Sequence, residues 1–275
     1  MLELPEVLTI SKQLRKHIVG KKVVGVLPPS KVYKFCWYNG EPAEYEAAIK
    51  DSEIISVEGF GIYVEIVFSN GYKLCFNDGV NIRLMSHDEK PKNFQLLIEL
   101  DDDLVLVFTV AMYGGIVLYD GNFDNEYYIK SKQAISPFSD AFTEHYHKIF
   151  AESKPNLSAK AFLGTEQRFP GVGNGVLQDI LFEAGIHPKR KISTFSEADR
   201  ERLLKCSITV LHEMVQNGGR DTEKNIFGEK GGYKVRMSKN TLSLSCPKCG
   251  GEIVKEAYLG GSIYYCAQCQ PLIKE

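Results

Sequence analysis

The 275-residue sequence contains no apolar run approaching the roughly 18 residues that a membrane span requires. Its start lacks the basic stretch followed by an apolar stretch that marks a secretory signal peptide. Its seven cysteines are an odd number, which argues against a fully disulfide-paired secreted domain. These absences predict a cytoplasmic protein that does not contact the membrane. If the source is bacterial, the protein is expected to associate with the nucleoid.

The chain also has little net charge, and its composition of 44% hydrophobic and 25% charged residues is that of an ordinary globular protein. The charge is uneven along the chain. Residues 1–154 carry 16 Lys and Arg against 22 Asp and Glu, whereas residues 155–275 carry 17 against 13. A modestly basic second half is compatible with nucleic-acid binding, although a surface charge of this size also serves plain solvation.

Four cysteines near the end of the chain form two pairs, Cys246-Pro-Lys-Cys249 and Cys266-Ala-Gln-Cys269, separated by sixteen residues. Two thiolates three residues apart can bind one ion from a tight turn, and a second such turn completes a tetrahedron. The spacing predicts one structural Zn²⁺ ion, because four sulfur ligands leave no position for a reactive water. Two disulfides in a secreted protein are the alternative interpretation.

Hydrophobic periodicity predicts a helix near the start, where Val7, Ile10, Leu14 and Ile18 recur at helical spacing. From residue 22 to about 128, short β-branched and aromatic runs alternate with turns, and Asn70-Gly71 is a hairpin signal. This series of strands predicts a sandwich or barrel. The strands are expected at 54–57, 63–68, 72–76, 94–99, 104–108 and 115–119.

Helical spacing returns between residues 137 and 218, and a glycine-rich stretch at 218–232 follows as a flexible connector or a binding loop. The string from Pro170 to Gly175 has glycines at alternate positions just before a predicted helix. Free N–H groups at such a helix start attract phosphate. A plain turn between helices that holds no ligand is the other interpretation.

Three strings resemble the formamidopyrimidine-DNA glycosylase and endonuclease VIII family. They are the start Met1-Leu2-Glu3-Leu4-Pro5-Glu6, the segment Gly171-Val172-Gly173-Asn174 with 181–188, and the cysteine motif 246–270. The resemblance implies an α+β multidomain fold. It places an N-terminal helix and antiparallel β-sandwich at 1–135, a helix-two-turn-helix domain at 136–240, and a zinc-finger β-hairpin at 241–275.

The family resemblance implies a monomer that binds damaged or bent double-stranded DNA and flips a base out of the stack. In active members an N-terminal proline amine attacks the sugar, and the adjacent glutamate, here Glu3, assists proton transfer. Glu6 is a weaker catalytic candidate. On matching positions, Lys160, Gly173 and Asn174 are expected to contact backbone phosphate, which positions DNA without reading its sequence.

The sequence departs from the family pattern where the chemistry takes place. Leu2 replaces the proline nucleophile, which leaves the Met1 amine as a candidate one residue out of position. Ile62 replaces a phosphate-contacting lysine, and Gly261 replaces the finger arginine. The family's usual intercalating residues are also missing, although Met112 and Tyr113 are candidates for a wedge between bases.

Two interpretations follow from these departures. The first is a glycosylase that acts through Glu3, with a weak or lost β-lyase step. The second is a catalytically inactive protein that recognises or shields damaged DNA, and a binder of RNA or protein on the same scaffold is a more remote variant. Arg220, near the glycine-rich stretch, is a further candidate for DNA contact, without a motif behind it.

Overall fold

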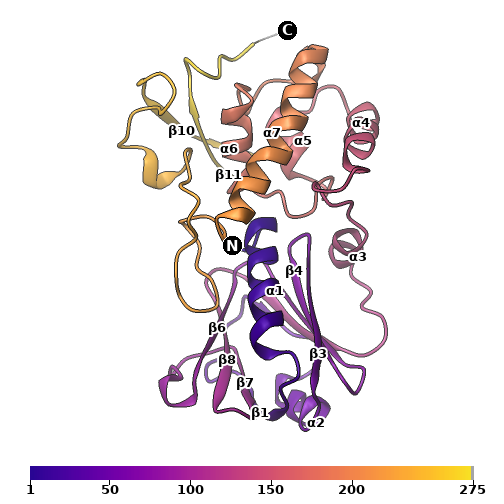
Figure 1. Ribbon diagram of the computed structural model, residues 1–275. Coiled ribbons are helices and arrows are strands. Elements are labelled where there is room, and N and C mark those ends of the chain that lie inside the picture. The colour runs from indigo at the N-terminus through magenta and orange to yellow at the C-terminus, as the bar shows by residue number, and fades with distance from the viewer. Residues whose placement is uncertain (274–275) are drawn as a thin grey trace. The chain divides into compact units, whose positions relative to one another are not determined.

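The computed structural model describes residues 1–273, and the chain forms two compact units (Figure 1). Unit 1 contains Met1–Lys132 and Gly218–Gly232, and unit 2 contains Gln133–Asn217 and the chain from Tyr233 onward. The glycine-rich segment 218–232 therefore belongs to unit 1, although the sequence on both sides of it belongs to unit 2. The division into domains at 1–135, 136–240 and 241–275 stays a prediction. Among residues 1–273, no helix combines the length and apolar character of a membrane span.

Unit 1 starts with helix α1 (Leu4–Ile18), which confirms the helix predicted from periodicity. Pro5 lies in the first turn, where the missing N–H has no helical partner to lose. Glu3 and Glu6 form a capping box that satisfies backbone donors at the helix start. The side chains at the predicted apolar positions are buried, and they are Val7, Ile10, Leu14 and Ile18.

Two sheets make up the rest of unit 1. The first sheet has the order β1 (Val23–Leu27), β7 (Leu96–Leu100), β8 (Leu104–Val110) and β6 (Val80–Ser86), with antiparallel neighbours. The second sheet has the order β2 (Cys36–Trp37), β9 (Gly114–Tyr119), β5 (Lys73–Asn77), β4 (Tyr63–Phe68) and β3 (Ile54–Phe60). The β2–β9 pair is parallel, and the other pairs of this sheet are antiparallel. Short helices complete the unit: η1 (Pro42–Glu44), α2 (Tyr45–Ile49), η2 (His87–Glu89) and α3 (Glu126–Lys132).

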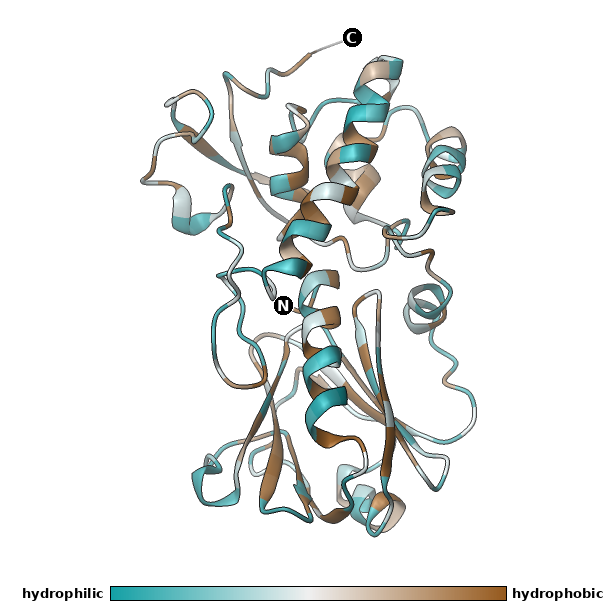
Figure 2. Ribbon diagram, in the orientation of Figure 1, coloured by the Kyte–Doolittle hydropathy of each residue, from teal (hydrophilic) through white to brown (hydrophobic). Residues whose placement is uncertain are grey.

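One hydrophobic core joins the two sheets and α1, and hydrophobic residues follow the strands in Figure 2. Phe76 of β5 meets Phe108 of β8 edge to face, with ring centroids 5.4 Å apart. Since one ring comes from each sheet, the sheets face each other and the predicted β-sandwich is confirmed. Asn70-Gly71 forms the expected hairpin between β4 and β5, and Gly71 has a φ of 93° that suits glycine.

Unit 2 combines helices with a C-terminal hairpin. The helices are α4 (Phe142–Glu152), α5 (Ala159–Gly164), α6 (Val176–Glu183) and α7 (Glu197–Gln216), with short turns η3 (Ile192–Thr194) and η4 (Lys239–Thr241). The hairpin consists of β10 (Ile253–Tyr258) and β11 (Gly261–Cys266). The buried carboxylate of Asp179 on α6 accepts the backbone N–H groups of Arg236 and Met237 at 2.9 and 2.8 Å. This contact fixes the chain that leads to the hairpin.

Candidate functional site

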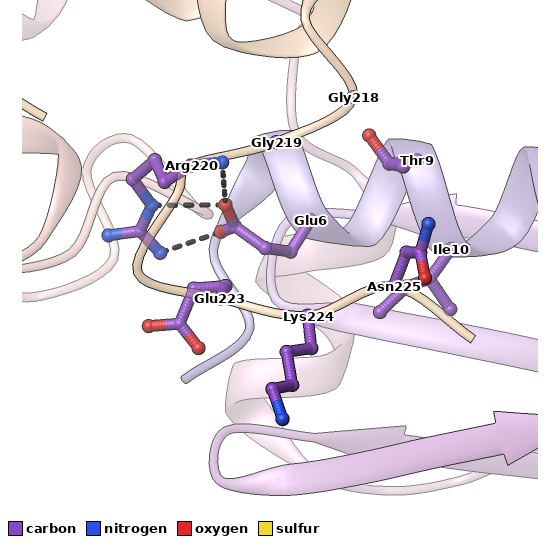
Figure 3. A pocket seen from close by; sticks show the side chains of 9 residues that line it. All are labelled: Glu6, Thr9, Ile10, Gly218, Gly219, Arg220, Glu223, Lys224 and Asn225. Atoms are coloured by element: carbon purple, nitrogen blue, oxygen red, sulfur yellow. Dashed lines mark hydrogen bonds and ion pairs between the residues drawn. The ribbon is translucent and has the colours of Figure 1, made fainter. Parts of the chain in front are cut away.

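Segment 218–232 brings Arg220 to the first turn of α1 (Figure 3). The guanidinium Nε donates to Oε1 of Glu6 at 3.0 Å, and Nη2 donates to Oε2 at 2.6 Å. The backbone N–H of Arg220 also donates to Oε1 of Glu6, at 3.1 Å. Oε2 of Glu3 lies 3.5 Å from Nη1 of Arg220. One buried cation therefore holds two carboxylates, both of which the sequence marks as catalytic candidates.

Burial would lower the pKa of Arg220, but the charges of Glu3 and Glu6 outweigh burial and raise it. The Arg220 side chain is only 3% exposed. Its contact with DNA stays a prediction, and in this structure its donors serve Glu6 and the carbonyl oxygen of Met1, the latter at 3.3 Å. The side chain is therefore committed to the start of α1.

Two glycines allow the segment to pass this close to α1 and to itself. Gly219 has a φ of 95°, and a Cβ there would lie 3.4 Å from Oε1 of Glu6. A Cβ on Gly231 would lie 2.1 Å from the carbonyl oxygen of Gly219, a distance no side chain can occupy. At these two positions glycine therefore allows close backbone approach.

The chain terminus is held by the same segment. The Met1 amine donates to Oε2 of Glu223 at 2.7 Å, so it is an ion-paired ammonium here. The Leu2 side chain is buried in the core of unit 1, and its N–H donates to the carbonyl oxygen of Asp78 at 2.6 Å. The contact with Glu223 therefore engages the amine that the sequence offers as a nucleophile.

In unit 2 the predicted phosphate-contacting residues gather at the tip of the β10–β11 hairpin. Lys160 Nζ donates to the carbonyl oxygen of Tyr258 at 2.7 Å, and Asn174 Nδ2 donates to that of Ser262 at 3.1 Å. Gly261 lies between them, since a Cβ there would be 3.5 Å from Lys160 Nζ and 3.7 Å from the Asn174 amide. Burial lowers the pKa of Lys160. The structure thus brings together Lys160, Asn174 and the position of the missing finger arginine.

Gly173 lies in the turn before α6, and its carbonyl oxygen accepts the N–H of Leu177 at 3.1 Å. Gln178, which sequence reasoning missed, holds this turn against the hairpin. Its Nε2 donates to Oδ1 of Asn174 at 3.2 Å and to the carbonyl oxygen of Ser262 at 3.0 Å. Gln178 could have been identified from the sequence as a polar residue within the apolar pattern of 176–183.

The wedge candidates lie in the connection between β8 and β9. Met112 is 60% exposed, and the Tyr113 ring lies 6.2 Å from the exposed ring of Trp37. Tyr33 supports the connection by donating its hydroxyl to the carbonyl oxygen of Met112 at 2.8 Å. Ile62, where the family has a lysine, packs against the aromatic cluster of Tyr63.

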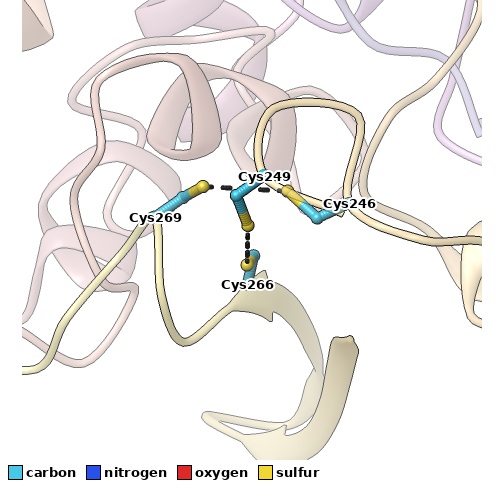
Figure 4. Close-up of side chains that lie close together, drawn as sticks. All are labelled: Cys246, Cys249, Cys266 and Cys269. Atoms are coloured by element: carbon cyan, nitrogen blue, oxygen red, sulfur yellow. Dashed lines mark hydrogen bonds between the residues drawn. The ribbon is translucent and has the colours of Figure 1, made fainter. Parts of the chain in front are cut away.

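The four predicted metal ligands meet at the base of the hairpin (Figure 4). All four sulfur atoms lie within 4.8 Å of one another. The Sγ atoms of Cys246 and Cys269 are 3.7 Å apart, and those of Cys249 and Cys266 are 3.5 Å apart. Two residues from each turn thus present one compact set of four thiols, which can hold a metal ion.

Replacing Arg220 with Gln should lower the free energy of unfolding by about 3–5 kcal/mol, because Glu3 and Glu6 would stay buried without their cation. Urea unfolding followed by circular dichroism measures this change. The matched control is Lys224→Gln in the same segment, whose exposed side chain should contribute less than about 0.5 kcal/mol. Equal effects of the two substitutions would contradict the structural role of the ion pair.

Comparisons with known proteins agree with this architecture. Residues 1–149 match the profile of the formamidopyrimidine-DNA glycosylase N-terminal domain. A formamidopyrimidine-DNA glycosylase of Pelotomaculum thermopropionicum is 29% identical, over 98% of this chain and 99% of its own. One of Exiguobacterium is 27% identical over the same shares of the two chains.

Solved structures share the fold. The Lactococcus lactis Fpg in complex with an abasic site containing DNA has a TM-score of 0.83 at 20% identity, covering 98% of this chain and 99% of its own. The MutM (Fpg) protein of Thermus thermophilus has a TM-score of 0.80 at 22% identity, covering 99% and 100%. Since the family profile spans more than half of the sequence and the fold agrees over 98–99% of the chain, the chain belongs to the formamidopyrimidine-DNA glycosylase family.

Proposed function

We propose that this chain binds damaged or distorted double-stranded DNA as a monomer in the cytoplasm, where it serves base-excision repair. The main support for the proposal is that Lys160 and Asn174 lie close together at the tip of the hairpin. A cation beside an amide can hold one backbone phosphate, which positions a duplex without reading its sequence. Family membership supports the choice of DNA, as does the abasic-site DNA bound to the Lactococcus lactis relative.

We further propose that any base release uses Glu3 and a water molecule, with the β-lyase step weak or lost. A Schiff base requires a neutral amine at the sugar, and Leu2 removes the family's proline. The Met1 amine lies one residue away from that position and is engaged in an ion pair with Glu223. Glu3 can still accept a proton from water once its Arg220 contact opens.

A catalytically inactive lesion-binding protein is the second candidate. The specific observation in its favour is the burial of Glu3, which is 4% exposed and lies against the Arg220 guanidinium. A carboxylate stabilised by a buried cation is a weak base, since the positive charge favours its ionised form. In that case Glu3 serves mainly to cap α1 and to balance Arg220.

The metal is proposed to be one structural Zn²⁺ bound by Cys246, Cys249, Cys266 and Cys269. With Zn–S bonds of about 2.3 Å, a tetrahedral site requires sulfur atoms about 3.8 Å apart. The observed separations of 3.7 and 3.5 Å fit this requirement. Zinc would fix the base of the hairpin and, through it, the carbonyl groups that hold Lys160 and Asn174.

Lys160→Met and Asn174→Ala should each weaken binding to an abasic-site duplex by about five- to tenfold, because each removes a phosphate partner. Lys160→Met should also reduce the slope of log affinity against log salt by about one. Fluorescence anisotropy at several salt concentrations measures both. Lys205→Met, an exposed lysine on α7, is the matched control and should change affinity less than about twofold. Salt-independent binding by the unmodified chain would argue against DNA as the partner.

Borohydride should trap no covalent adduct between the unmodified chain and an abasic-site duplex. Leu2→Pro should restore trapping once Met1 is removed, because it supplies a secondary amine at the family position. Leu2→Ala, with a primary amine there, is the control and should trap less. A strong adduct with the unmodified chain would show that one of its present amines is nucleophilic.

Assays of base release and of binding on duplexes with oxidised bases separate the two candidates. Base release that Glu3→Gln abolishes, with binding retained, supports the glycosylase. Lesion-selective binding without release supports the inactive binder.

Metal analysis of protein purified without chelator should find about one zinc ion per chain. Cys249→Ser should lose the ion and weaken duplex binding, because the hairpin depends on the metal for its fold. Cys206→Ser on α7 is the matched control and should retain zinc. Absence of zinc from the unmodified chain would refute the assignment.

A further inference from the structure

The tip of the β10–β11 hairpin carries an exposed apolar side chain at a position where the backbone favours a polar one. Tyr258 pairs with Gly261, so Leu259 and Gly260 form a two-residue turn. Their φ values of 49° and 70° are both positive, as a type I′ turn requires. Asn-Gly is a favoured sequence for this turn, whereas a leucine side chain is strained at positive φ. Leu259 therefore occupies its position against the local backbone preference.

Burial within unit 2 does not account for the choice of leucine at this position. Leu259 is 54% exposed, so only part of its apolar area is removed from water by folding. Residues held in an unfavourable backbone conformation cluster at functional sites, where the surrounding structure maintains the strain. The conformation and the exposure of Leu259 together indicate a contact with a partner outside the chain.

The surrounding structure holds the turn from both sides. Lys160 Nζ donates at 2.7 Å to the carbonyl oxygen of the peptide group that joins Tyr258 to Leu259. On the other side of the turn, the carbonyl oxygen of Ser262 accepts Nδ2 of Asn174 at 3.1 Å. A tip that is fixed before binding loses little conformational freedom when it binds, which favours affinity.

Two cations lie beside the tip, and the tip itself is uncharged. Lys160 Nζ lies 6.0 Å from the centroid of the Tyr258 ring, and Lys189 Nζ lies 5.5 Å from the same centroid. The ammonium of Lys160 has three N–H donors, of which the carbonyl oxygen of Tyr258 takes one. Residues 257–263 contain no charged side chain. An apolar group next to a lysine suits a DNA strand, which presents sugars between its phosphates.

We propose that Leu259 is an apolar DNA contact, which packs on a sugar of the strand whose phosphate Lys160 and Asn174 bind. The inference rests on the proposed function, because it takes duplex DNA as the partner. Gly261 leaves the hairpin without the finger arginine of the family, and Leu259 supplies apolar contact area two residues away. Such a contact adds affinity without reading the sequence, and it releases no counterions.

Leu259→Asn should improve the turn and weaken DNA binding, because it creates the favoured Asn-Gly sequence and removes the apolar side chain. The midpoint of thermal unfolding should stay unchanged or rise by up to about 4 °C, with the zinc content unchanged. Affinity for an abasic-site duplex, measured by fluorescence anisotropy, should fall about five- to tenfold. The slope of log affinity against log salt should stay the same, whereas Lys160→Met should reduce it.

Two further variants serve as controls. Leu259→Met keeps an apolar side chain of similar size and should bind the duplex within about twofold of the unmodified chain. Leu244→Asn makes the same change at a leucine that is 59% exposed in unit 2 but lies outside the hairpin. It should change duplex affinity less than about twofold.

Unchanged affinity of Leu259→Asn, or an equal loss in Leu244→Asn, would overturn the inference and leave the proposed function intact. A lower thermal midpoint or lost zinc in Leu259→Asn would also overturn it, because Leu259 would then support the hairpin itself. A reduced salt slope in Leu259→Asn would indicate a lost phosphate contact instead of an apolar one. If the unmodified chain has no affinity for the duplex, the proposed function fails, and this inference fails with it.

Discussion

The buried contact of Arg220 with Glu6 and Glu3 is the interaction on which the arrangement of the chain terminus, the start of α1 and segment 218–232 depends. It joins residues 214 positions apart in the sequence and fixes the start of α1. The same guanidinium holds the carbonyl oxygen of Met1, and the same segment pairs the Met1 amine with Glu223. The charges of Arg220, Glu3 and Glu6 are buried and are stable only together, because removing one leaves the others uncompensated. The terminus, the helix cap and segment 218–232 therefore form one cooperative group.

This group also constrains the chemistry. In an enzyme, a catalytic carboxylate must change its protonation, and a nearby fixed cation opposes this by favouring the charged form. Glu3 thus has a structural role that would compete with the proposed catalytic one. Opening of the Arg220 contact decides between the two, since it would release Glu3 and loosen segment 218–232 together. Base release and the ordering of this segment are for that reason expected to be coupled.

The structural features predicted correctly from the sequence are those that short-range patterns encode. The periodicity of α1, the Asn70-Gly71 hairpin and the cysteine spacing each encode their structure within a few residues, and all three are found as expected. Strand β6 was missed although its apolar and polar residues alternate, and β1 was missed because Gly25 interrupts it. A Cβ at Gly25 would lie 2.5 Å from a side-chain oxygen of Glu99, a contact between distant positions. The packing of segment 218–232 could likewise not be predicted from the sequence, because it depends on carboxylates at the other end of the chain.

Two of the departures from the family, at positions 2 and 261, differ in how firmly the fold holds them. Leu2 is buried in the core of unit 1, so restoring proline there removes apolar contacts as well as adding an amine. Gly261 is not required by the structure, because its φ is not in the left-handed region and a Cβ would meet Lys160 only at 3.5 Å. A Cβ at 261 would thus fit locally, beside Lys160 and Asn174. Leu2, at the position of the family's proline, is thus part of the core of unit 1. At position 261, in contrast, the hairpin backbone does not require glycine.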